Sequence, residues 1–495
     1  MNLLRKYIKP SNLFGMFLVI HVLIWTLVPY YTRTSLHHDV LEGIAQGLAY
    51  QFGYSKHPFL SMWVIASVWR FIGEHDWIIY LFSQLIMCSG FYYIWKLNYA
   101  LLSPWKALLA TIISDGLVSF NINANILTPD TFQIPCWAAI GYYLYKLAWQ
   151  PNQKNWMILG MLFGLGFLIK YQIIVLMISC IIFIYSTEAL KKHLFTTRHY
   201  MSILIFILTI SPHIIWIFKS KFANFNYTHD VLLHGKGLSL SKLLLFYLEN
   251  TLAYCLPVVL LFIITFLAAK TKQRTISSLN KKLIICLSWG PWLVTLMLLI
   301  IFKIDIYARW MTPYFSFLGT FLLSFFSIQL KVKHIYRFGG LFAAGTMLLI
   351  MTNFFRPISN PHCDAFYPNK DIAKFINTAW QNAAHQPLQY IGGSRYLVAA
   401  IVPYIYPAPQ PFFSLDARKN PWIDIVRLKQ TGGVLVWDIN SNYAWDRETL
   451  CYGKPPENLK GLYPFINDIQ TKVFYTAKQH PIEIAYTIML PETTG

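Results

Sequence analysis

The stretch LFGMFLVIHVLIWTLVPYY, residues 13–31, is a nearly continuous apolar run that holds no Asp, Glu, Lys or Arg. As a helix with a rise of 1.5 Å per residue it would be about 28 Å long, close to the ~30 Å hydrocarbon core of a bilayer. Arg5 and Lys6 precede the run, and no small-x-small cleavage site follows it. We therefore expect an uncleaved signal-anchor helix that crosses a membrane.

Comparable apolar segments recur as far as residue 355. Hydrophobic residues make up 56% of the 495 residues and charged residues only 13%. This composition predicts a polytopic α-helical membrane protein with about 11–13 spans. The expected spans are roughly 13–31, 77–95, 106–123, 131–149, 156–169, 172–187, 201–218, 243–269, 283–302, 310–329 and 338–355. The apolar segment 58–71 is only about 14 residues long, so we expect it to lie in, or dip into, the outer membrane interface.

The charge pattern indicates an orientation. A formal net charge of +20 would suggest nucleic acid in a soluble protein. Here the Lys and Arg residues fall in short runs between apolar segments, and no basic face with interleaved aromatic residues stands apart, so we expect no nucleic-acid partner. Because basic loops stay in the cytoplasm, the runs predict a cytoplasmic N-terminus. The first loop, 32–76, and everything after residue 355 would then lie on the outer face.

The composition changes at about residue 356, where short apolar runs alternate with polar helices and Pro-rich turns. This change predicts a membrane domain over 1–355 and a soluble α/β domain over 356–495. The expected strands are 388–391, 433–437, 472–475 and 482–488, and the expected helices are 371–384 and 396–401. Cys363 and Cys451 lie in the soluble part, where they could form one disulfide or remain two free thiols.

The first loop collects several kinds of chemically active side chain next to the membrane: Asp39, Glu42, Lys56 and His57. Asp39 and Glu42 are three residues apart, so on a helix both carboxylates would share one face. Paired carboxylates suit a general base or a cation site. The alternative is a capped helix, with Asp39 at the N-cap and Glu42 three positions later. The mixture of residue types in this loop favours a functional site.

A second group of candidates lies in or beside the apolar segments: Asp130, Lys170, Tyr171 and Arg309. The apolar halves 156–169 and 172–187 are each too short to cross a bilayer, so we expect the chain to turn at Lys170 below the membrane surface. A charge at that depth is tolerated only inside protein or in a water-filled cavity, which favours a site.

Each of these residues also has a structural interpretation. Lys170 could extend its ammonium to the interface. Asp130 could cap the helix that it begins, although a cap can still face a cavity. Arg309 could form an interfacial anchor with the tryptophan that follows it. His213 is best explained by helix packing.

The basic candidates indicate the kind of ligand. Lys56, Lys170 and Arg309 would all lie on the outer side, where excess positive charge requires an anionic partner, and a lipid-linked phosphate is the natural one. No specific metal motif is present, but a divalent ion that bridges Asp39 or Asp130 to a phosphate stays open. No Walker loop or GxGxxG motif is present, which disfavours nucleotide-driven chemistry.

Several motifs occur in a particular order. After the acidic first loop come Gly53-Tyr54-Ser55-Lys56-His57-Pro58, Leu127-Thr128-Pro129-Asp130, Gly164-Leu165-Gly166-Phe167-Leu168-Ile169-Lys170-Tyr171, Pro212-His213-Ile214-Ile215-Trp216 and Arg309-Trp310-Met311-Thr312-Pro313. In this order the chain resembles the bacterial GT-C glycosyltransferases, which are relatives of protein mannosyltransferases and of the lipid A aminoarabinose and galacturonic acid transferases. The resemblance covers about residues 10–355.

The resemblance implies a multi-pass enzyme of the bacterial inner membrane. Such an enzyme takes a sugar from a polyprenyl phosphate donor, usually undecaprenyl phosphate, and passes it with inversion to a periplasmic-side acceptor such as lipid A or lipopolysaccharide core. By resemblance, Asp39 is the catalytic carboxylate, Lys56 and Lys170 hold the donor phosphate, and Asp130 shapes the site or binds a metal. The remaining expected substrate-binding residues are Glu42, His57, Tyr171 and Arg309.

Two other functions remain as alternatives. A transporter or flippase of a lipid-linked sugar would also combine many helices with buried charge, although no inverted repeat is visible in the sequence. A protein O-mannosyltransferase would share the donor type and differ in the acceptor. The sequence leaves the sugar and the acceptor open.

Overall fold

The computed structural model describes residues 9–492 apart from 226–238, 268, 270–275, 305, 327, 360–363, 440–454, 457 and 464–465. The chain divides into two compact units. We call them the helical unit, which comprises Met1–Leu27, Tyr80–Ile214 and Thr228–Thr352, and the mixed unit, which comprises Val28–Ile79, Ile215–Tyr227 and Asn353–Gly495. The expected disulfide partners Cys363 and Cys451 lie outside the described residues.

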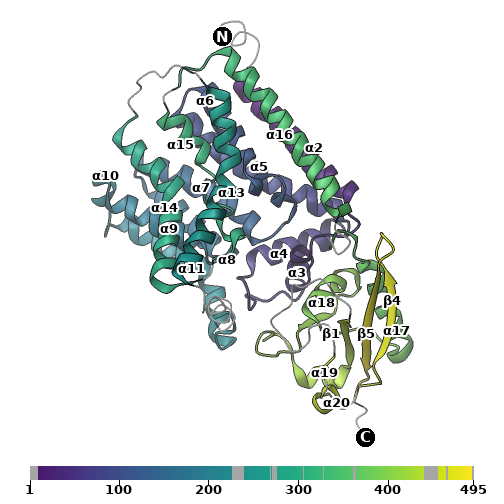
Figure 1. Cartoon of the computed structure of the whole chain (residues 1–495). Helices are drawn as coiled ribbons and strands as arrows, with labels where there is room; N and C mark the ends of the chain where they lie inside the picture. Colours follow the sequence, from purple (N-terminus) through teal and green to yellow (C-terminus); the bar gives the residue numbers. More distant parts are fainter. Residues whose placement is uncertain are drawn as a thin grey trace. The chain divides into compact units, whose positions relative to one another are not determined.

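Long apolar helices dominate the helical unit (Figure 1). Among the described residues six are long and apolar enough to cross a membrane: α2 (Pro10–Thr32), α5 (Asp76–Leu101), α11 (Thr197–Lys219), α13 (Leu240–Phe266), α14 (Ser278–Phe302) and α16 (Val332–Ser359). Counting a bent helix pair as one span raises the number to seven. The prediction of a polytopic helical membrane protein is confirmed.

Other expected spans lie on shorter or less apolar helices: α7 (Pro129–Trp149), α8 (Gln153–Ile169) and α9 (Ile173–Tyr185). Two expected spans are not continuous helices. In 106–123, α6 (Pro104–Ile112) passes into short 3-10 turns with a bend of 90°. The Asn121 side-chain amide there donates to the carbonyls of Asp115 and Leu117. These hydrogen bonds replace hydrogen bonds that a continued helix would make. In the described residues of 310–329, the helical elements are the turn η5 (Ala308–Met311) and the short helix α15 (Leu318–Phe325).

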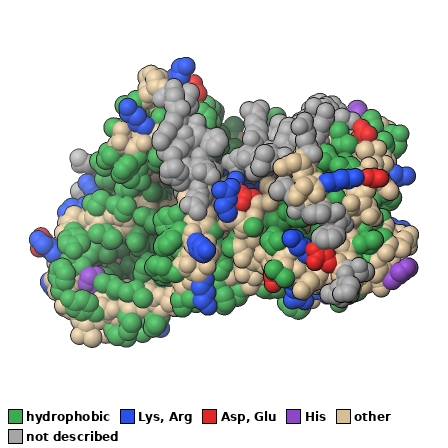
Figure 2. Space-filling model, turned by 90° about the horizontal axis from the view of Figure 1, so that it is seen from below, with side chains coloured by type: hydrophobic (Ala, Val, Ile, Leu, Met, Phe, Trp, Pro, Cys, Tyr) green, Lys and Arg blue, Asp and Glu red, His purple; other side chains and the backbone are tan. Residues whose placement is uncertain are grey.

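Many side chains of the long helices face outward. Only 28% of the apolar window of α11 and of α13, and 6% of that of α16, is buried within the protein. Exposed examples are Ile207, Leu208, Leu252, Met297 and Leu348. Figure 2 shows a face on which hydrophobic side chains cover wide areas. Such surfaces are stable in contact with lipid and costly in water.

The first loop folds into two helices. The helix α3 (His38–Gly47) begins where the His37 ring nitrogen Nδ1 accepts a hydrogen bond from the Asp39 amide at 3.2 Å. It buries Leu41 and Ile44 completely. The expected helix in 58–71 is confirmed as α4 (Leu60–Ser67), which continues as a π-helical turn, η1 (Val68–Ile72).

The carboxy-terminal part of the mixed unit is built around a five-stranded sheet in the order β2-β1-β3-β5-β4. The strands are β1 (Tyr390–Gly393), β2 (Gln410–Phe413), β3 (Gly433–Asp438), β4 (Gln470–Tyr475) and β5 (Pro481–Met489). β1 pairs in parallel with β2 and β3, whereas β5 pairs antiparallel with β3 and β4. The four predicted strands are present, and β2 was missed because it directly follows the Pro-rich segment.

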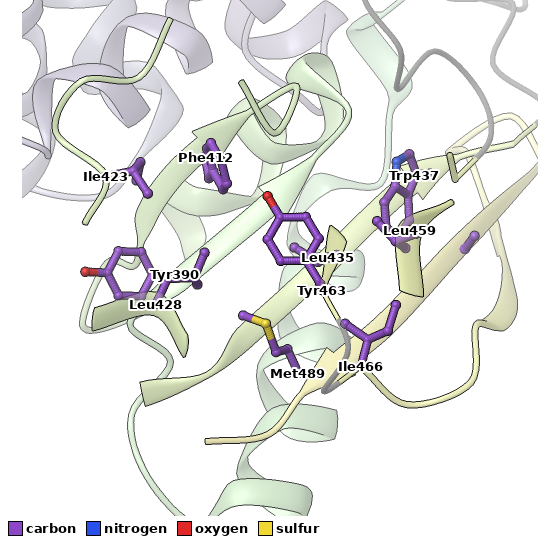
Figure 3. Packing of buried hydrophobic residues seen from close by; sticks show 11 residues of the cluster. Tyr390, Phe412, Ile423, Leu428, Leu435, Trp437, Leu459, Tyr463, Ile466 and Met489 are labelled. Carbon is purple, nitrogen blue, oxygen red and sulfur yellow. The ribbon is translucent and has the colours of Figure 1, made fainter. Parts of the chain in front are cut away.

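Helices cover both faces of this sheet. The helices are α17 (Asn369–Ala384), α18 (Arg395–Ile401), α19 (Ile425–Thr431) and α20 (Leu459–Leu462). On one face a hydrophobic cluster joins the strands to α19 and α20, and its strand residues include Tyr390, Phe412, Leu435 and Met489 (Figure 3). On the other face α17 packs through Phe375, whose ring lies 5.3 Å from that of Tyr486. The prediction of an α/β region in the carboxy-terminal part is confirmed.

Backbone and side-chain hydrogen bonds attach the first loop to the carboxy-terminal region within the mixed unit. The amides of Thr34 and Ser35 both donate to the Ala365 carbonyl, at 2.8 and 3.1 Å. The indole of Trp69 donates to the Pro403 carbonyl at 3.1 Å. The segment after α2 thus contacts residues more than 300 positions later in the chain and forms one compact unit with them.

We predict that Gly47→Ala destabilises the protein. A Cβ atom at residue 47 would lie 2.1 Å from the Met62 carbonyl oxygen, so α3 and α4 would have to separate. Overpacking of this kind costs about 1–3 kcal/mol, which a lowered unfolding temperature of the purified protein would report. Gly461→Ala is the matched control, because nothing lies within 4 Å of a Cβ atom there. Equal unfolding temperatures for the two variants would contradict the packing described here.

Candidate functional site

Asp39 lies at the start of α3 beside two imidazoles. Its carboxylate oxygens are 3.7 Å from His37 Nδ1 and 3.4 Å from His38 Nε2, and the two imidazole rings are 4.2 Å apart. The carboxylate is largely buried, with 16% of the side chain exposed. Asp39 is therefore an acidic group held in a preformed, mostly dehydrated setting.

Asp364, from the carboxy-terminal part, organises this same end of α3. Its Oδ2 accepts from the His38 amide at 3.2 Å and lies 3.3 Å from His38 Nδ1, while the Arg33 guanidinium donates to its Oδ1 at 2.6 Å. Burial would raise the pKa of Asp364, but His37, His38 and Arg33 outweigh burial and hold this pKa well below its usual range. Burial and the neighbouring His38 lower the pKa of His37 to about 3.

Glu42 lies one turn further along α3 and is held by two cations. The Arg395 guanidinium contacts its Oε1, and the Lys56 ammonium lies 3.5 Å from its Oε2. The side-chain amide of Gln46 also donates to Glu42 Oε1, at 3.0 Å. Burial alone would raise the pKa of Glu42, but Arg395 and Lys56 outweigh burial and lower it to about 2. His57, the next expected residue, is half-buried, and its carbonyl accepts from the Tyr54 amide at 3.0 Å.

The second group of candidates lies in the helical unit, where Asp130 and Lys170 form an ion pair. Asp130 is the second residue of α7, and Lys170 follows the last residue of α8. The Lys170 Nζ donates to Asp130 Oδ1 at 2.5 Å and lies 6.0 Å from the Trp310 ring centroid. The expected turn at Lys170 is confirmed. The Gln133 side-chain amide donates to the Gly166 carbonyl, which also accepts from the Lys170 backbone amide.

The residues next to this ion pair form a second contact. The Tyr171 hydroxyl lies 2.7 Å from His213 Nε2, and the His213 side chain is completely buried. The Gln172 amide donates to the Trp310 carbonyl. Arg309, one residue earlier on η5, is exposed. Tyr171 and Lys170 thus lie at one break between helices, with His213 as an additional polar neighbour.

The structure adds residues that the sequence prediction did not include. Arg395 contacts the candidate Glu42 from 353 positions away in the chain, and Asp364 contacts His38, the neighbour of Asp39, from 326 positions away. Neither belongs to a recognisable motif, so only the tertiary structure identifies them. His213 had been assigned to helix packing, and its contact with Tyr171 is equally compatible with a polar role.

One group of the described residues could hold a metal ion. His37, His38 and Asp39 offer ligand atoms that all lie within 4.8 Å of one another. Two imidazoles and a carboxylate are ligands that Zn²⁺ accepts, and Asp364 is placed to orient His38 from behind. The residues present therefore fit a divalent ion. His37 would bind it through Nε2, or through Nδ1 with loss of the hydrogen bond from the Asp39 backbone amide.

The Asp130–Lys170 pair gives a prediction about stability. Removing one partner leaves a poorly solvated charge, so Lys170→Met and Asp130→Asn should each lower the unfolding temperature clearly, in keeping with costs of about 3–5 kcal/mol for breaking buried pairs. The double variant should lose less than the sum of the two, because no charge remains unpaired. Thermal unfolding of the three purified variants tests this, and additive losses would show that the two side chains are not coupled.

The low pKa of Glu42 gives a prediction about pH. The ionised carboxylate is stabilised in the folded state, so this stabilisation is complete above the ordinary pKa of 4.5 and is lost as the pH falls toward about 2. The shift corresponds to about 3 kcal/mol. The difference in unfolding temperature between the wild type and Glu42→Gln should therefore shrink between pH 6 and pH 3. A difference that stays constant over this range would contradict the pairing.

The chain resembles known proteins in sequence over one segment and in fold over nearly its whole length. Residues 56–216 match the sequence model of the family described as dolichyl-phosphate-mannose-protein mannosyltransferase. No curated protein matches the chain.

Two solved structures of ArnT from Cupriavidus metallidurans share the fold. The structure bound to undecaprenyl phosphate has 11% sequence identity and a TM-score of 0.61, and the match covers 96% of this chain and 98% of that one. The apo structure has 12% identity and a TM-score of 0.60 with the same coverage. Residues 56–216 thus match the mannosyltransferase family model, and nearly the whole chain shares its fold with these two ArnT structures.

Proposed function

We propose that this protein is a glycosyltransferase of the bacterial inner membrane. It moves a sugar from a polyprenyl phosphate, such as undecaprenyl phosphate, to an envelope acceptor on the periplasmic side, such as lipid A or lipopolysaccharide core. The observation that carries the proposal is the charged surface of α3, where the buried Asp39 lies one turn from Glu42 and its cation Lys56. The fold shared with an ArnT structure that holds undecaprenyl phosphate supports the donor class.

The chemistry follows from these groups. An acceptor oxygen attacks the anomeric carbon of the donor, the bond between that carbon and the phosphate oxygen breaks, and the polyprenyl phosphate leaves with the bonding electrons. Attack from the side opposite the phosphate inverts the anomeric centre. Asp39 takes the proton of an acceptor hydroxyl, or only orients the acceptor if the latter is an already ionised phosphate. Lys56 and Lys170 stabilise the departing phosphate by their positive charge.

The remaining candidates have supporting roles in this proposal. Asp130 keeps the Lys170 ammonium in place by the ion pair at 2.5 Å. Tyr171 and Arg309 bind the donor or the acceptor, and His57 lies beside Lys56 in the first loop. By the distribution of basic residues, the N-terminus is cytoplasmic and the carboxy-terminal α/β region is periplasmic.

Transport is the principal rival function. A flippase would move the lipid-linked sugar across the membrane without breaking the bond between sugar and phosphate. It would need charged groups for binding but no acceptor and no general base. A protein O-mannosyltransferase would use the same chemistry on a Ser or Thr hydroxyl, for which deprotonation by Asp39 would be essential.

The test is Asp39→Asn in purified protein. Transfer of sugar from undecaprenyl-phosphate-linked donors to lipid A or core acceptors should fall by about 10²–10⁴-fold, the usual contribution of a general base, whereas stabilisation by undecaprenyl phosphate should persist. Asp371→Asn is the matched control, because that exposed carboxylate lies on α17. Full transfer by Asp39→Asn, or sugar-lipid transport without any transfer in the wild type, would contradict the proposal.

A second experiment identifies the sugar and the acceptor. Mass spectrometry of lipid A, core and envelope proteins from a strain that lacks this protein should show the loss of one hexose, hexosamine, pentosamine or hexuronic acid from one acceptor. Loss from a protein would favour the O-mannosyltransferase alternative. An unchanged envelope glycome would contradict a transferase role.

A further inference from the structure

Arg395 reaches the first-loop candidates from the start of α18. β1 ends at Gly393 with a φ of +125°, and a Cβ atom there would lie 1.9 Å from the Val436 carbonyl oxygen. Glycine thus allows the chain to leave the sheet and enter α18 directly. The helix packs against α3 (Figure 1), which puts the Arg395 guanidinium in contact with Glu42. Its Cζ also lies 5.8 Å from the centre of the Phe413 ring.

The contact between Arg395 and Glu42 is largely shielded from solvent. The exposed fraction is 15% for the arginine side chain and 12% for the glutamate side chain, whereas it is 30% for Lys56. A guanidinium against a carboxylate in such surroundings is strong, because both charges are partly dehydrated. Arg395 is therefore the principal counter-ion of Glu42.

Lys56 interacts with Glu42 more weakly than Arg395 does. Its ammonium lies 3.5 Å from Oε2, at the outer limit of a hydrogen bond, and it is the more exposed of the two cations. If Arg395 were absent, Glu42 would be a buried carboxylate with Lys56 as its nearest cation. The ammonium would then be drawn into a closer ion pair with Glu42 and would be less available to an anionic ligand.

Asp364 supports the first turn of the same helix. Its carboxylate accepts a hydrogen bond from the His38 backbone amide and forms an ion pair with Arg33. Carboxy-terminal residues thus contact α3 both at the turn that carries Asp39 and at the turn that carries Glu42. Tyr396, next to Arg395, brings its ring to 5.9 Å from that of His38. The two contacts belong to one surface on which α18 and the Asp364 turn face α3.

We propose that Arg395 is a positioning residue of the active site, which neutralises Glu42 and so leaves the Lys56 ammonium to the phosphate of the lipid donor. The carboxy-terminal α/β region is then an integral part of the donor site. This inference rests on the proposed function, since it assumes that Lys56 binds a polyprenyl phosphate. It assigns to Arg395 an effect that passes through Glu42.

The experiment measures the affinity of the purified full-length protein for undecaprenyl phosphate, which requires no knowledge of the sugar. Arg395→Met should weaken binding about tenfold, the effect of losing one charge-assisted contact to phosphate. Arg395→Lys should retain most of the affinity, because it keeps a cation beside Glu42. Arg427→Met is the matched control on the same unit, where the arginine lies exposed on α19.

The decisive variant combines Arg395→Met with Glu42→Gln. This variant removes the carboxylate that lies 3.5 Å from the Lys56 ammonium, so it should bind undecaprenyl phosphate more tightly than Arg395→Met alone. The double variant also has no unpaired buried charge, so it should fold even if Arg395→Met alone is unstable. A purely structural role would also be relieved by Glu42→Gln, so the affinities are compared at a temperature at which Arg395→Met is still folded, where a structural role predicts no loss of affinity.

The remaining outcomes separate this inference from the function on which it rests. Two outcomes would overturn the role of Arg395 and leave the transferase proposal standing. In the first, the wild type binds and Arg395→Met binds with the same affinity. In the second, Arg395→Met binds more weakly and the addition of Glu42→Gln does not restore binding. Absence of undecaprenyl phosphate binding by the wild type would overturn both.

Discussion

The pairing of charges at low dielectric is the constraint on which the candidate sites depend. An ionised carboxylate that is removed from water without a partner costs several kcal/mol. Asp130 meets this cost with Lys170, Glu42 with Arg395, and Asp364 with Arg33. Each pair joins residues from different elements, so each pair fixes the relative position of those elements as well as the charge. Asp130, Glu42 and Asp364 are therefore held in place by the same contacts that pair their charges.

The same constraint explains where the helices are interrupted. A continuous helix satisfies its own carbonyl groups, whereas a break inside an apolar unit needs side chains to do so. The Asn121 side-chain amide provides this at the bend after α6, and the Gln133 side chain adds a hydrogen bond to the Gly166 carbonyl at the break beside Lys170. The breaks place polar and charged groups among apolar helices. Apolar side chains on the outer surfaces then need no partner but lipid.

The sequence was sufficient for features that depend on local patterns. The apolar run 13–31 predicted α2, the two short halves around Lys170 predicted a turn, and the spacing of Asp39 and Glu42 predicted that they share a helix. Features that depend on distant contacts were not accessible. Strand β2 was hidden by the prolines before it, since it is defined by pairing with β1, and the helix breaks in 106–123 follow from side-chain hydrogen bonds that no periodicity reveals. Arg395 carries no local signal, because its role is set by a residue 353 positions earlier.

That separation bears on the biosynthesis of the chain. Synthesis at about 5–20 residues per second puts roughly 20–70 s between the emergence of Glu42 and that of Arg395. During this interval α3 has no Arg395 to pair with Glu42 and no α18 to pack against. Completion of the first loop therefore waits until the region around residue 395 has been synthesised, and a nascent chain that terminates before it would leave Glu42 without its arginine.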